Sequence, residues 1–157
     1  MKRNALLLLG VLALMHTTAQ NVSLLTIDEM NERIQRGKDT TFVIHFWSTW
    51  CKPCIKELPF IEKLNAEHKV EKIKVMLVSV DYVSNLHKTV KPFVKKRKLL
   101  TDVFILNEKD QQTYIDRIDK QWSGTIPATL FVRGDRRRFA EREFTYEELV
   151  NEYKSFQ

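Results

Sequence analysis

The feature that most constrains this chain is a pair of cysteines placed where an apolar run gives way to a helical pattern. The run is Thr41–Trp47, rich in β-branched and aromatic residues, and the pair follows it in the sequence Trp50-Cys51-Lys52-Pro53-Cys54. Apolar residues then recur at helical spacing, at Ile55, Leu58, Ile61 and Leu64. These patterns predict a buried strand that turns into a helix, with both thiols at the start of that helix.

This placement favours a reactive thiol at Cys51. The unpaired amides and the macrodipole at a helix N-terminus carry roughly half a positive charge and favour an anion. Helix N-termini and Cys-x-x-Cys pairs lower a thiol pKa from ~8.5 to about 7. Lys52 adds a positive charge beside Cys51, and Cys54, one turn further on, can close a disulfide with it. The pattern therefore predicts redox chemistry.

The first residues have the composition of an export signal. Lys2 and Arg3 precede an apolar core, Ala5–Met15, and a small-residue cleavage site, Thr17–Ala19. The core is shorter than the ~20 residues of a transmembrane helix. We expect a signal peptide over residues 1–19, one domain over 20–157, and a location in the periplasm or cell envelope. Two alternatives stay open: an uncleaved signal that acts as a membrane anchor, and a buried N-terminal helix.

The number of cysteines and the distribution of basic residues limit the classes of function that fit this chain. The two cysteines of the chain both lie in the motif. Since exported proteins normally use cysteines for structural disulfides, a single pair in this position is better explained as reactive. The basic runs Lys95–Lys98 and Arg136–Arg138 contain no interleaved aromatic residues. We interpret them as a solvated helix face and a hairpin arm, and we expect no nucleic-acid partner.

The remaining sequence alternates between strand and helix patterns. Capping boxes at Thr26-x-x-Glu29 and Thr145-x-x-Glu148 predict helix starts, and Gly37 predicts a helix end. Strand, helix and strand around the motif imply a right-handed parallel crossover. Strands are expected at 22–25, 41–47, 73–80, 103–106, 128–132 and 139–144, and helices at 26–37, 51–68, 92–98, 111–118 and from 145 onward.

The motif and the order of the elements together resemble thioredoxin. Ile126-Pro127 falls just before the penultimate strand, where thioredoxins have a cis-proline packed against the active disulfide. The string Phe46–Cys51, the position of Glu57 and the export signal are more similar to the TlpA/ResA branch of envelope thiol–disulfide oxidoreductases. The resemblance covers about residues 26–156. It implies an α/β thioredoxin-like fold, with a central mixed β-sheet flanked by helices and an insert between the βαβ and ββα halves.

The resemblance assigns a role to each cysteine. Cys51 would attack a substrate disulfide, and Cys54 would resolve the mixed disulfide. Lys52 and Pro53 would tune the redox potential: they resemble the Gly-Pro of reducing thioredoxins, and Pro53 offers no amide to the Cys51 thiolate. We therefore expect a monomeric reductant of protein disulfides, supplied by a membrane thiol electron donor.

Two residues are candidate proton acceptors for Cys54. In the ResA branch, a Glu at the position of Glu57 serves this role; the alternative is a solvated acid that complements the helix dipole. His45 stands where thioredoxin has a buried Asp, and a histidine can relay protons near neutral pH. The alternative for His45 is a core histidine bonded to a neighbouring backbone group.

Three further residues are expected to bind substrate. Trp50 should pack over the site, and a cis Pro127 would let the Ile126 backbone pair with an extended substrate segment. The alternatives are ordinary packing for Trp50 and a trans proline at a strand start.

Other classes of function remain as alternatives. A zinc site needs about four ligands, and the chain after residue 19 offers His45, His68 and His87 but no second cysteine pair, so we expect no metal and no cofactor. A thiol peroxidase would need Thr at position 48, which is Ser48. An oxidant or isomerase of the same fold and a non-catalytic binding module also stay open.

Overall fold

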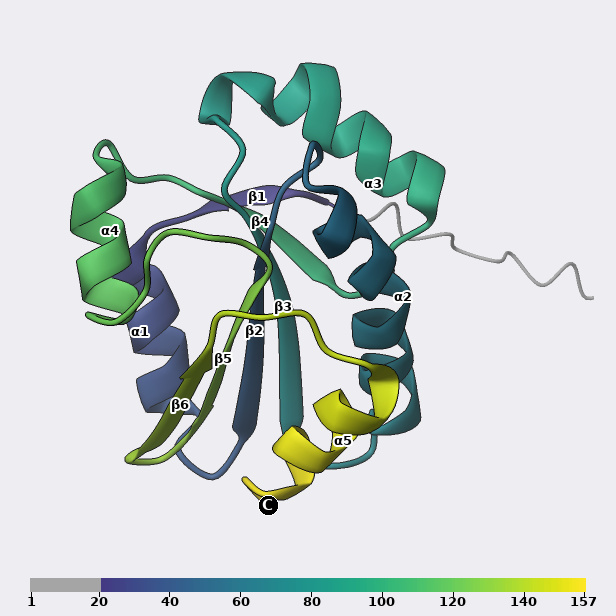
Figure 1. The fold of residues 1–157 in the computed structure, drawn as a ribbon, viewed down its shortest axis with the longest axis vertical. Helices are drawn as coiled ribbons and strands as arrows, with labels where there is room; N and C mark the ends of the chain where they lie inside the picture. Colours follow the sequence, from purple (N-terminus) through teal and green to yellow (C-terminus); the bar gives the residue numbers. More distant parts are fainter. Residues whose placement is uncertain (1–20) are drawn as a thin grey trace, which may run out of the picture.

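Six strands form one mixed sheet in the computed structural model, which describes residues 21–157 (Figure 1). The strands are β1 Ser23–Leu25, β2 Thr41–Trp47, β3 Ile73–Ser79, β4 Asp102–Leu106, β5 Ala128–Arg133 and β6 Arg136–Ala140. Their order in the sheet is β1-β4-β3-β2-β5-β6. The first four run parallel, and β5 and β6 are antiparallel to their neighbours. The expected mixed sheet is therefore confirmed.

Helices cover both faces of this sheet (Figure 1). They are α1 Ile27–Arg36, α2 Lys52–Glu67, α3 Lys91–Arg97, α4 Gln111–Ile118 and α5 Tyr146–Lys154, with a 3₁₀ turn (η1, Val83–Asn85) and a π turn (η2, Leu86–Val90) before α3. One apolar core lies between the sheet and α2, α3 and α5, and a second lies between the sheet and α1 and α4. The expected insert is the stretch between β3 and β5, which contains α3, β4 and α4. Within residues 21–157, no helix is long and apolar enough to span a bilayer.

Local sequence signals explain where the helices begin and end. Thr26 and Thr145 each accept a hydrogen bond from the backbone of a Glu three residues on, and that Glu side chain bonds back to the Thr amide. Each box satisfies amides that would otherwise lack a partner at the helix start. Gly37 caps the end of α1, and its N–H donates to the Arg33 and Ile34 carbonyl oxygens. The predicted capping boxes and helix stop are confirmed.

The central strand β2 is buried along its whole length. Because side chains alternate between the faces of a strand, Val43 and Trp47 enter the core under α2, whereas Ile44 and Phe46 enter the core under α1. His45 shares the parity of Val43 and Trp47, so it belongs to the face that α2 covers. The strand leads directly into the cysteine motif and fixes its position at the carboxyl end of the parallel strands.

The prediction for the last strand was wrong in its bounds. A strand was expected at 139–144, but β6 covers Arg136–Ala140 and pairs with β5 across a turn at Gly134, which has φ +58°. The three arginines are exposed on an edge strand, where charged side chains are tolerated because only one edge is hydrogen-bonded. The predicted signal segment, 1–19, lies outside the described residues.

Candidate active site

Cys51 and Cys54 form a disulfide at the start of α2, with their sulfur atoms 2.02 Å apart. Cys51 is the N-cap residue of the helix, and the Cys54 amide donates to Cys51 Sγ over 3.2 Å. Pro53 has no N–H to offer. Cys54 is fully buried, whereas Cys51 keeps 5% of its surface exposed. An incoming sulfur can therefore approach Cys51 but not Cys54. Lys52, between them, is exposed.

The loop before β5 brings Ile126 and Pro127 to the disulfide. The Ile126–Pro127 peptide bond is cis, and the Ile126 carbonyl oxygen lies 3.7 Å from Cys51 Sγ. Ile126 is 75 positions away from Cys51 in the chain. The fold thus brings the Ile126-Pro127 segment next to the cysteine motif, and it leaves the Ile126 carbonyl oxygen beside the sulfur of Cys51, the more exposed of the two cysteines.

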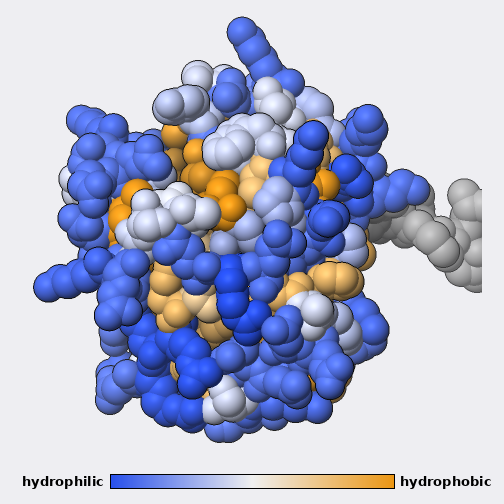
Figure 2. Space-filling view, viewed as in Figure 1, coloured by the Kyte–Doolittle hydropathy of each residue, from blue (hydrophilic) through white to orange (hydrophobic). Residues whose placement is uncertain are grey.

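Trp50 lies in a groove next to the disulfide rather than in the core. Its side chain is 69% exposed. It lines a groove of about 320 Å³ together with Tyr82 and Val83, which follow β3, and with Tyr114 and Ile126. Figure 2 shows exposed apolar surface in this part of the molecule, between α3 and α4. An extended chain lying in this groove would pass Trp50 and Ile126 on its way to Cys51.

Glu57 lies one turn after Cys54 and is buried, with 2% of its surface exposed. One carboxylate oxygen, Oε1, accepts a hydrogen bond from the Phe144 amide over 2.9 Å, while Oε2 has no protein partner among the described residues. Burial raises the pKa of Glu57 to about 7, against a smaller lowering by the Phe144 hydrogen bond. The alternative of a solvated acid is wrong, because the side chain is enclosed between α2 and the segment before α5.

His45 is buried on the face of β2 that α2 covers. Its Nδ1 lies 3.0 Å from the Thr129 hydroxyl oxygen on β5, and its Nε2 has no partner within residues 21–157. Burial lowers the pKa of His45 to about 3. The imidazole is therefore neutral across the physiological range and is a weak proton acceptor. Its bond goes to a side chain of the neighbouring strand, not to the backbone as the core alternative expected.

The Asp81 carboxylate lies beside the site, in contacts that the sequence did not predict. Asp81, buried at the carboxyl end of β3, accepts hydrogen bonds from the Thr49 amide (2.9 Å), the Thr49 hydroxyl (2.7 Å) and the Ser79 hydroxyl (2.7 Å). These bonds hold the residue directly before Trp50. They also join the loop that carries Trp50 to the loop that carries Tyr82. A polar residue ending a buried strand was visible in the sequence, but its partner was not.

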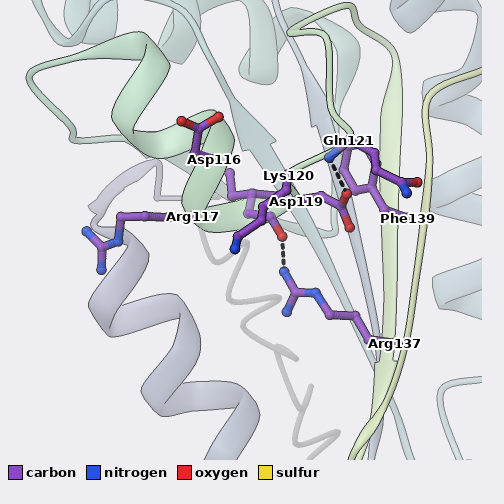
Figure 3. A pocket seen from close by; sticks show the side chains of 8 residues that line it. Asp116, Arg117, Asp119, Lys120, Gln121, Arg137 and Phe139 are labelled. Atoms are coloured by element: carbon purple, nitrogen blue, oxygen red, sulfur yellow. Dashed lines mark hydrogen bonds between the residues drawn. The ribbon is translucent and has the colours of Figure 1, made fainter.

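A second hollow lies away from the disulfide, between the end of α4 and β6. Figure 3 shows Arg137 of β6 reaching toward α4, where it donates to the Ile118 carbonyl oxygen. Charged side chains of both signs line the hollow, among them Asp116 and Lys120. It contains no cysteine. Among residues 21–157, no three metal-ligating side chains gather at this or any other place.

Known proteins are similar in sequence to part of this chain. The thioredoxin-like protein YneN of Bacillus subtilis is 32% identical over 87 residues, which are 55% of this chain and 51% of that protein. The thiol-disulfide oxidoreductase ResA of Bacillus cereus is 36% identical over 92 residues, which are 59% of this chain and 48% of that protein. The match thus spans about half the length of these curated relatives.

Solved structures agree on the fold. The crystal structure of StoA from Bacillus subtilis matches with a TM-score of 0.59 and 24% identity over 74% of this chain and 84% of that one. A thioredoxin family protein from Chlorobium tepidum matches with a TM-score of 0.63 and 16% identity over 78% and 83%. The fold is therefore thioredoxin-like. The model of the AhpC/TSA family matches residues 15–137, most of the sequence, and this chain belongs to that family.

Proposed function

We propose that this protein is an exported thiol–disulfide oxidoreductase that reduces protein disulfides through Cys51 and Cys54. One observation carries the proposal: a disulfide at the N-cap of α2 with Cys51 as the outer sulfur and Cys54 buried behind it. Relatives named as thiol-disulfide oxidoreductases support it, as does the export-signal pattern of residues 1–19.

Reduction of a substrate follows two exchanges. The Cys51 thiolate attacks one sulfur of the substrate disulfide, forms a mixed disulfide and releases the other substrate sulfur as a thiolate. Cys54, as a thiolate, then attacks Cys51 Sγ and releases the second substrate sulfur. The substrate gains two electrons, and the Cys51–Cys54 disulfide is left. A membrane thiol donor would reduce this disulfide again.

Glu57 is the better acceptor for the proton that Cys54 loses. A general base works best when its pKa lies near the working pH. The pKa of Glu57 is about 7, whereas that of His45 is about 3. Glu57 also follows Cys54 by one helical turn, and its Oε2 is free of protein hydrogen bonds within the part of the chain described. His45 would then have a structural role, as a neutral residue of the core that α2 covers.

The Ile126 carbonyl and Trp50 would position the substrate. A carbonyl 3.7 Å from Cys51 Sγ suits an extended segment that pairs with the loop as an added strand. Trp50 would contact the side chains of that segment, because most of its surface is available.

The reducing direction rests on the residues between the cysteines. Lys52 contributes no side-chain hydrogen bond to Cys51, and Pro53 has no amide, so the Cys54 amide is the donor to Cys51 Sγ among the described residues. Fewer donors stabilise the reduced thiolate less, and about 1.4 kcal/mol corresponds to ~30 mV for a two-electron couple. Equilibration with glutathione buffers tests the direction. A potential near −120 mV, as in strong oxidants, would overturn it.

Trapping tests the activity itself. Reduced Cys54→Ser protein, mixed with a disulfide-bonded peptide, should accumulate a mixed disulfide at Cys51 that mass spectrometry detects. Cys51→Ser protein is the matched control and should trap nothing, because Cys54 is enclosed. Trapping by neither variant would refute the proposal. Hydrogen peroxide consumed by the reduced protein, without any peptide reduction, would favour the thiol peroxidase alternative.

A further inference from the structure

The positive charge of this protein is concentrated in one segment. Residues 82–100 contain six Lys and Arg residues and no Asp or Glu. The rest of the chain carries 20 basic and 20 acidic residues, so the formal net charge of +6 resides in this segment. The six residues are Lys88, Lys91, Lys95, Lys96, Arg97 and Lys98.

The segment lies beside the start of the redox helix (Figure 1). It forms η1, η2 and α3. The Phe93 ring packs 5.4 Å, centroid to centroid, from that of Trp47, and Arg97 and Lys98 line a hollow with Ile55, the residue after Cys54. The Glu62 carboxylate of α2 accepts hydrogen bonds from the backbone amides of Leu100 and Thr101. These two bonds hold the end of the segment against α2. The basic side chains therefore border the redox end of the molecule.

Ion pairs within residues 21–157 do not account for these cations, although Arg97 lies over the Phe93 ring, 5.4 Å from its centroid. None of the six lies within 4.0 Å of a carboxylate of residues 21–157. The arginines of β6 behave differently: Arg138 pairs with Glu152, and Arg136 donates to the Ser155 carbonyl oxygen. The helix dipole favours cations in the last turn of α3. The dipole of α3 does not explain the positive charge at Lys88, which precedes the helix, or at Lys91, which begins it.

The same segment starts in the groove of the candidate site. Tyr82, 81% exposed, and Val83 line that groove opposite Trp50. The groove itself is lined by these aromatic side chains and by charges of both signs, Asp81, Glu108 and Lys109. The basic residues follow Val83 in the chain, on η2 and α3, so a polypeptide that extends beyond the groove on this side would meet them. We propose that the basic surface, defined as Lys88, Lys91, Lys95, Lys96, Arg97 and Lys98, docks an acidic polypeptide segment whose disulfide reacts at Cys51.

This inference rests on the proposed function and specifies its substrate class. An acidic polypeptide fits better than an anionic membrane. A helix that binds a bilayer inserts its apolar face, but Val90 and Val94 are already buried in the core beneath α2 and α3. Complementary charge mainly raises the association rate, by 10-fold or more at low ionic strength, and the effect falls with salt.

Two peptides with the same internal disulfide test the proposal, one flanked by four Glu and the other by four Lys. Their reduction by the pre-reduced protein is followed at low salt and at about 1 M salt, where the Debye length is only about 3 Å. The variant is Lys88→Glu/Lys95→Glu/Lys96→Glu. The matched control is Lys38→Glu/Lys69→Glu/Lys154→Glu, three exposed lysines that follow α1, follow α2 and end α5. These ends of the three helices lie away from α3 (Figure 1). Uncharged hydroxyethyl disulfide reports basal activity.

We expect the acidic peptide to react about tenfold faster than the basic one at low salt, and the two rates to converge at high salt. The variant should lose this preference and the control should keep it, with equal rates toward hydroxyethyl disulfide. Equal rates for both peptides, or a preference that survives in the variant, would overturn the inference and leave the proposed function standing. So would binding to phosphatidylglycerol vesicles through these lysines without a peptide preference. Reduction of no disulfide at all would refute both.

Discussion

Replacing Glu57 with Gln should remove a pH-dependent loss of stability. The folded protein holds a proton on Glu57 up to about pH 7, whereas the ordinary carboxyl value of 4.5 applies to the unfolded chain. Between these values the folded state binds more protons than the unfolded state, so the free energy of unfolding falls as pH rises. The difference between 4.5 and about 7 corresponds to about 3 kcal/mol once the carboxyl is ionised in both states.

The Gln side chain has the same shape and carries no charge. Its carbonyl oxygen can accept the Phe144 amide that Glu57 Oε1 accepts in the wild type. We therefore expect the two proteins to have similar stability at pH 4, below the pKa of this carboxyl in the unfolded chain, and the variant to be more stable by up to about 3 kcal/mol at pH 8.

Urea unfolding between pH 4 and pH 8 measures this difference. The oxidised proteins are used because bonded cysteines do not titrate. The slope of the unfolding free energy against urea should stay unchanged, as it tracks the surface exposed on unfolding. Glu32→Gln, at an exposed position of α1, is the matched control and should follow the wild type. If the wild type and Glu57→Gln gave parallel pH profiles, Glu57 would not be the buried titrating group.

Three further substitutions probe the site. His45→Asn should leave the midpoint of the pH–rate profile of peptide reduction unchanged, because His45 is already neutral above about pH 3; a shifted midpoint would make His45 the proton acceptor. Thr49→Val removes the hydroxyl that donates a hydrogen bond to Asp81 Oδ1, and it should lower the free energy of unfolding, measured in urea, by about 1–3 kcal/mol. A loss below about 0.5 kcal/mol would contradict a stabilising role for this hydrogen bond. Trp50→Ala should change stability by less than about 0.5 kcal/mol but raise the KM for a peptide disulfide about fivefold, or about 1 kcal/mol, with an unchanged KM contradicting substrate contact.

Local rules predicted most of the fold. The capping boxes at Thr26 and Thr145, the stop at Gly37 and the buried strand 41–47 depend on neighbours a few residues away, and each lies where the sequence placed it. The helix at 111–118 was also predicted, and Asp110 caps it. Such features are readable because the physical cause and its effect share one short window.

The last strand shows where the hydrophobic pattern misleads. Arg136–Arg138 have no apolar alternation, so the hydrophobic pattern predicts the strand over residues 139–144, which follow them. The register of β6 is instead set by the tight turn at Gly134 and by pairing with β5, and an edge strand tolerates exposed arginines.

The parts of the site that depend on distant segments were not predictable in the same way. Asp81 and Thr49 are 32 residues apart, and no pattern in either loop specifies the other. Glu57 was identified as a candidate, but its burial depends on Phe144, 87 residues away. The exposure of Trp50 likewise follows from how the groove is assembled around Tyr82 and Ile126.

The hydrogen bond from the Phe144 amide to Glu57 has a consequence for how the protein would respond to warming. It fastens the segment ahead of α5 to the helix that carries the cysteines. Partial opening of α5 would hydrate the carboxyl and restore its normal acidity while the central strands kept their amide protons from exchange. Such local opening would shift the pH range over which Glu57 could accept the Cys54 proton while the sheet stayed folded.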